Sequence, residues 1–123
     1  MLTRFKHVLF GGIFTLILCD QAIAHAHLAS ANPAVDGAVA VSPAELDLKF
    51  SEAVNLKFSG VKVAGPDKAT VATGDAFLAQ GDESMLVVPV SSALSAGAYT
   101  VDWHVLSKDG HKSHGTYKFT VKP

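Results

Sequence analysis

Apolar and polar residues alternate with a period of two in several short segments of this 123-residue chain. In residues 45–51 the side chains of Leu46, Leu48 and Phe50 fall on one face, which is the pattern of a half-buried β-strand. Similar segments, bounded by turn residues, cover 56–63 with a kink at 59–60, then 84–90, 99–105 and 116–121. No segment after residue 24 keeps a helical period, so we predict an all-β domain.

The residues before the segment 99–105 refine this prediction. A Tyr that begins a strand, as Tyr99 does here, can bond back to upstream backbone in a tyrosine corner. Trp103 shares a face with Tyr99 and Val105 and is expected in the core. Short strands at this spacing favour an immunoglobulin-like Greek-key β-sandwich of about seven strands.

The first 24 residues differ in character from the rest. Arg4 and Lys6 precede an apolar run over residues 8–18, and Ala22-Ile23-Ala24 has the form of an A-x-A cleavage site. The apolar run is shorter than the roughly 20 residues of a transmembrane helix. We therefore predict a secretory signal peptide over residues 1–24, cleaved after Ala24, and a single exported domain over residues 25–123.

The chain has one cysteine, Cys19, and it lies within the predicted signal. An alternative is that Cys19 is the lipidated residue of an anchored protein, but Leu18 stands where a small residue is normal. Without residues 1–24 the chain has no cysteine and can form no disulfide. Any metal ion must then be held by nitrogen and oxygen atoms.

Charge argues against nucleic acid as a partner. Without residues 1–24 the chain keeps 8 of its 10 basic and 10 of its 11 acidic residues, a net charge of −2. It has no basic patch or run of like charges, which nucleic-acid binding would require. A domain of about a hundred residues can bury one modest core, and we expect a monomer.

Candidate metal ligands lie at the new amino terminus and in the connection between the last two predicted strands. Cleavage after Ala24 would give His25 both an α-amine and an imidazole, which together form a chelate. Asp109 and His111 are two residues apart, so in an extended backbone their side chains project to the same side, and Gly110 lets the chain bend between them. Three nitrogens and one carboxylate oxygen fit Cu(II) best and Zn(II) or Ni(II) next. Each motif is weak alone, since an Asp in such a loop often bonds its own backbone.

Three further histidines carry alternatives. His27 could complete a chelate of the amine, two backbone amides and its own imidazole, or it could be a surface residue beside the ligands. His114 is expected to be a solvated loop residue or an auxiliary ligand. His104 alternates with Trp103 and shares a face with Asp102, so we expect it to be partly exposed.

The chain resembles the CopC-type periplasmic copper-resistance family over nearly all of residues 25–123. The motifs that carry the resemblance are His25-Ala26-His27-Leu28 with Ser30-Ala31-Asn32-Pro33-Ala34, Leu94-x-x-Gly97-x-Tyr99-x-Val101-x-Trp103, and Ser107-x-Asp109-Gly110-His111 with Gly115-x-Tyr117-x-Phe119-x-Val121.

This resemblance implies a Greek-key β-sandwich in the periplasm that binds one Cu(II) ion per chain. The implied ligands are the amine and imidazole of His25, with Asp109 and His111. It also implies a role in copper resistance or homeostasis, and a link with an inner-membrane copper transporter or other periplasmic copper proteins.

Some members of the family hold Cu(I) in a methionine-rich loop. Here Met85 is the only methionine after the signal and lies in an apolar strand pattern, so we place it in the core and predict no dedicated Cu(I) site.

Two other classes of function stay open. The pair of His25 and a second histidine resembles the histidine brace of copper monooxygenases, but Asp109 would oppose reduction, and the chain is short for a substrate platform. We therefore expect no enzymatic activity. A sandwich interaction module without metal is the third possibility.

Overall fold

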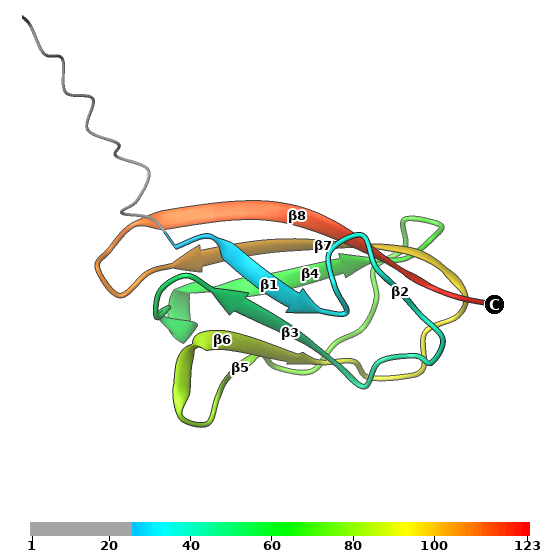
Figure 1. The fold of residues 1–123 in the computed structure, drawn as a ribbon, viewed down its shortest axis with the longest axis horizontal. Coiled ribbons are helices and arrows are strands. Elements are labelled where there is room, and N and C mark those ends of the chain that lie inside the picture. The colour runs from blue at the N-terminus through cyan, green and yellow to red at the C-terminus, as the bar shows by residue number, and fades with distance from the viewer. Residues whose placement is uncertain (1–25) are drawn as a thin grey trace, which may run out of the picture.

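The computed structural model describes residues 26–123, which form two packed β-sheets (Figure 1). The first sheet has the strand order β1 (Leu28–Asn32), β3 (Glu45–Phe50), β6 (Asp82–Pro89) and β5 (Phe77–Ala79). The second has the order β2 (Ala38–Val39), β8 (Lys112–Val121), β7 (Gly97–Leu106) and β4 (Gly60–Ala64). All neighbours pair antiparallel except β2 and β8, which are parallel. The all-β sandwich prediction is confirmed, with eight strands where about seven were expected.

The alternating segments bury one face each, as the sequence predicts. Leu46, Leu48 and Phe50 of β3 are at most 1% exposed. The ring of Phe50 meets Trp103 of β7 edge-on, with 5.1 Å between centroids, so this pair joins the two sheets. The core therefore lies between the sheets, and it contains Trp103 as predicted.

The tyrosine corner is also confirmed. The hydroxyl of Tyr99 donates a 2.6 Å hydrogen bond to the backbone carbonyl of Ser95. The ring of Tyr99 stacks on Phe119 of β8 at 5.4 Å. Gly97, two residues before Tyr99, has φ +141°, and a Cβ on this residue would clash with the side chain of Pro66. This position therefore requires glycine.

The strand predicted over residues 56–63 is wrong in its first half. Leu56–Phe58 form a short 3-10 helix, η2, and β4 begins only at Gly60. Leu56 and Phe58 are 37% and 54% exposed, so their alternation did not mark a buried face.

Met85 is not in the core, contrary to the prediction. It pairs with Lys49 in the register of β3 and β6, one position from the inward-facing Leu86, and is partly exposed. The described residues include no helix long and apolar enough to cross a membrane.

Candidate metal centre

The loop after β7 is a tight turn that brings Asp109 and His111 together. The backbone N–H of Gly110 donates to the carbonyl of Ser107 at 2.9 Å, and the N–H of Ser107 donates to the carbonyl of His111 at 2.9 Å. Gly110 has φ +93°, a conformation that favours glycine. The two side chains therefore converge because the backbone turns, whereas an extended backbone was predicted.

Oδ1 of Asp109 lies 3.2 Å from Nδ1 of His111. The side chains are 48% and 46% exposed, so both reach solvent at the end of the sandwich. A carboxylate and an imidazole side by side form half of the predicted four-atom donor set.

The buried Ser107 orients this pair, a role that was not predicted from the sequence. Ser107 is 1% exposed, and its hydroxyl donates to Oδ1 of Asp109 and accepts the backbone N–H of His111 at 3.2 Å. The hydrogen bond from Ser107, followed by that of His111, lowers the pKa of the Asp109 carboxyl. The carboxylate is therefore held ionised, which is the form that binds a metal ion.

The first described residue, Ala26, is fixed beside this loop. Its carbonyl accepts a 2.6 Å hydrogen bond from the hydroxyl of Ser113 in β8, and Ala26 is fully buried. Ser113 is two residues past His111. Figure 1 shows the start of β1 and the β7–β8 loop at the same end of the sandwich. His25 itself lies outside the described residues.

His27 is paired with the end of β3 instead of with the loop. Its N–H donates to Oγ of Ser51 at 3.0 Å, and its carbonyl accepts the N–H of Ser51 at 2.9 Å. Nδ1 of His27 also lies 3.2 Å from the same hydroxyl. Both backbone polar groups of His27 are therefore occupied by Ser51.

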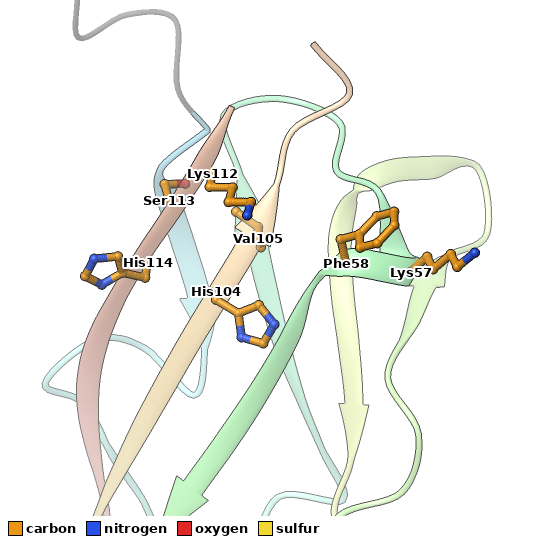
Figure 2. Close-up of a pocket in the computed structure, with 7 residues that line it drawn as sticks. All are labelled: Lys57, Phe58, His104, Val105, Lys112, Ser113 and His114. Carbon is orange, nitrogen blue, oxygen red and sulfur yellow. The ribbon is translucent and has the colours of Figure 1, made fainter. Parts of the chain in front are cut away.

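His114 lies in strand β8 and not in a loop, contrary to the prediction. It pairs directly with His104 of β7, and its side chain alternates with that of Ser113, so it points away from Ala26. His104 is exposed, as predicted. Figure 2 shows both imidazoles on the wall of a pocket on the outer face of this sheet.

Within residues 26–123, no three His, Cys, Asp or Glu side chains lie close enough to hold a metal ion. The described part of the chain thus brings together two of the predicted ligands, Asp109 and His111, and the third, His25, lies outside it.

Comparison with known proteins identifies the fold and family together. The model of the CopC domain matches residues 28–122. The crystal structure of CopC from Methylosinus trichosporium OB3b superposes with a TM-score of 0.74 at 32% identity, covering 80% of this chain and 95% of that one.

Two curated proteins are similar over most of their length. Protein YobA of Escherichia coli (strain K12) is 43% identical over 108 residues, which is 88% of this chain and 87% of YobA. Copper resistance protein C of Escherichia coli is 38% identical over 129 residues, which is 95% of this chain and 96% of that protein. The chain therefore belongs to the CopC family, as its motifs indicated.

Proposed function

We propose that this protein is exported to the periplasm and binds one Cu(II) ion there, storing it or handing it on in copper resistance or homeostasis. The proposed ligands are the amine and imidazole of His25 with Asp109 and His111. The hydrogen bond between Ser113 and Ala26 is the observation that carries this proposal, because it fixes the residue after His25 beside the loop that holds the other two ligands.

The donor atoms favour Cu(II) over other ions. Imidazole and amine nitrogens with one carboxylate oxygen suit a tetragonal ion, and Cu(II) binds such sites more tightly than Ni(II) or Zn(II). The ionised Asp109 leaves bound Cu(II) with one net positive charge and stabilises it relative to Cu(I). Copper in this site would therefore be carried as Cu(II) instead of being cycled, so we propose a carrier and not an enzyme.

Met85 gives no support to a Cu(I) site. Cu(I) prefers several soft donors, and the only methionine among the described residues lies on β6 opposite Lys49. One thioether does not make such a site.

The competing chelate through His27 needs the backbone nitrogens of residues 26 and 27 as ligands. In this structure the N–H of His27 donates to Ser51 and Ala26 is buried. The chelate would have to break the pairing with β3, so we propose that His27 stays off the copper. His114 faces away from Ala26, so we leave it out of the proposed ligand set as well.

The partners follow from the proposed cargo. A periplasmic copper carrier would exchange its ion with an inner-membrane copper transporter or with other periplasmic copper proteins. Membership of the CopC family supports the copper-related part of this proposal.

A Cu(II) titration followed by EPR tests the ligand set. One preparation begins at His25, and the other carries one additional residue before it. We expect the extra residue to weaken binding by orders of magnitude and to change the spectrum, because it removes the chelate of amine and imidazole. Equal binding by both preparations would exclude the amine as a ligand.

A second experiment separates a carrier from an enzyme. The copper-loaded protein is mixed with ascorbate and oxygen, and peroxide is measured over time. We expect no sustained production. Copper-dependent turnover would contradict the carrier and favour the histidine-brace alternative.

A further inference from the structure

A second pair of histidines lies outside the proposed copper centre. His104 of β7 and His114 of β8 are directly opposite each other in the antiparallel register. Side chains at opposed positions have Cβ atoms about 4.5–5.5 Å apart, close enough for two imidazoles to share one metal ion. Both residues are exposed.

The two imidazoles line the same pocket. They border a pocket of about 410 Å³ on the outer face of the sheet, together with Phe58, Lys57 and Lys112. In Figure 2 the ring of His104 leans toward β4, while that of His114 points to the far side of β8, away from His104. Exposed side chains change rotamer within nanoseconds, so the two rings can turn toward each other.

Gly60 of β4 makes room for the His104 ring in its present orientation, so the ring must leave this position to turn toward His114. It pairs with His104, and a Cβ at this position would lie only 2.9 Å from Cε1 of His104. Within residues 26–123, neither imidazole has a hydrogen bond or an ion pair. The ring nitrogens of both are therefore available to a ligand.

We propose that His104 and His114 form a second, weaker Cu(II) site on the outer face of the β7–β8 ribbon. The ion would be held by one nitrogen of each imidazole, with water in its other positions. Imidazole is a good ligand for Cu(II), which binds such nitrogens more tightly than the other common divalent ions do. The ammonium groups of Lys57 and Lys112 line the same pocket and repel a cation. This site therefore fills only after the proposed centre at Asp109 and His111.

The order of filling rests on the proposed function, but binding at His104 and His114 can be tested apart from it. The protein beginning at His25 is labelled with ¹⁵N and titrated with Cu(II) beyond one equivalent. Paramagnetic broadening of amide signals locates each ion. In the second step we expect broadening of residues around positions 104, 114 and 60.

Substitution of each imidazole tests whether the two act together. In H104Q and in H114Q we expect the second step to weaken by at least about tenfold, because the second nitrogen of a chelate binds at a high effective concentration. The first step is expected to be unchanged. T116A is the matched control, because Thr116 is exposed on the same face of β8, two residues from His114, and it should leave both steps unaltered.

Other outcomes would overturn the proposal. If each single variant retained the wild-type affinity of the second step, the imidazoles would not form a chelate. If H27Q removed the second step instead, the second ion would sit on the amino-terminal chelate. A missing first step would count against the proposed centre at His25, Asp109 and His111 while leaving the effect of H104Q and H114Q to decide this site.

Discussion

The hydroxyl of Ser113 and the carbonyl of Ala26 are joined by a 2.6 Å hydrogen bond across 87 positions of the chain. It connects β8 to the residue that would follow the mature amino terminus. The bond therefore fixes the distance between two halves of the proposed centre.

Removing this hydroxyl should loosen the centre. In S113A we expect Cu(II) affinity to fall by about 10–100-fold, the usual effect of losing a contact that orients metal ligands. Competition with a chelator of known affinity measures the change. S113T keeps a hydroxyl and should recover most of the affinity. If S113A bound Cu(II) like the wild type, the bond to Ala26 would have no role in the centre.

Ser107 should affect Cu(II) affinity by orienting the Asp109 carboxylate. In S107A the carboxylate loses the hydroxyl that holds it, so we expect a loss of Cu(II) affinity of about 10–100-fold and a change in the EPR parameters. The control is S59A, which removes another hydroxyl that bonds to the end of β7 at Leu106. A similar loss of affinity in both variants would point to a general loosening of this end and not to orientation of Asp109.

Ser51 should keep Cu(II) in the proposed centre and out of the amino-terminal chelate through His27. In S51A the N–H of His27 loses its acceptor, which is 3.0 Å away in this structure. We expect part of the Cu(II) to move to the amine, the two amides and the imidazole of His27, with the visible and EPR spectra of a four-nitrogen site. The double variant S51A/H27Q should restore the original spectrum. An unchanged spectrum in S51A would show that other contacts exclude this chelate.

The sequence predicted the strands that bury a long apolar face, and it missed the short strands β1, β2 and β5 and the first half of β8. β8 begins at Lys112, although alternation was recognised only from Thr116. The reason is that Gly115 occupies an inward position, where Trp103 fills the space: a Cβ on Gly115 would lie 2.7 Å from that ring. From the sequence alone, a glycine at an inward strand position predicts a loop, because the large residue that fills its space lies on the neighbouring strand.

The site was predictable to a similar extent. The closeness of Asp109 and His111 was expected from their spacing of two residues, although a turn at Gly110 and not an extended backbone brings them together. The roles of Ser51 and Ser113 depend on partners 24 and 87 residues away, and nothing in the local pattern marks either serine. His25 as a ligand stays a prediction.

Loss of the hydroxyl should change the free energy of unfolding differently at two buried tyrosines, Tyr99 and Tyr117. Tyr99 donates to the carbonyl of Ser95, so Y99F should lower the free energy of unfolding by about 0.5–1.5 kcal/mol. The hydroxyl of Tyr117 is buried with no hydrogen-bond partner among the described residues, and burial together with the charge of Asp47 raises its pKa. Y117F should therefore be neutral or stabilising in urea denaturation. A large destabilisation by Y117F would reveal a partner for this hydroxyl.

Acid stability should depend on Asp82. Its Oδ2 lies 2.6 Å from Nζ of Lys49, and its Oδ1 accepts two hydrogen bonds from Ser84. The bond from Lys49, followed by those from Ser84, lowers the pKa of the Asp82 carboxyl to about 2. Because the pKa is lower in the folded protein, the carboxylate stabilises the fold above its unfolded pKa of about 3.9. This stabilisation is lost as the pH falls toward 2.

Comparison of wild type and D82N by chemical denaturation at pH 5, 4, 3 and 2 checks this sign. The wild type should be the more stable at pH 5, and the difference should shrink from pH 4 downward until little of it remains at pH 2. E83Q is the control, because Glu83 forms an exposed pair with Lys108 at 3.5 Å, and such pairs contribute little to stability. A difference between wild type and D82N that stayed constant from pH 5 to 2 would mean that Asp82 acts through packing, and that its charge does not stabilise the sheet.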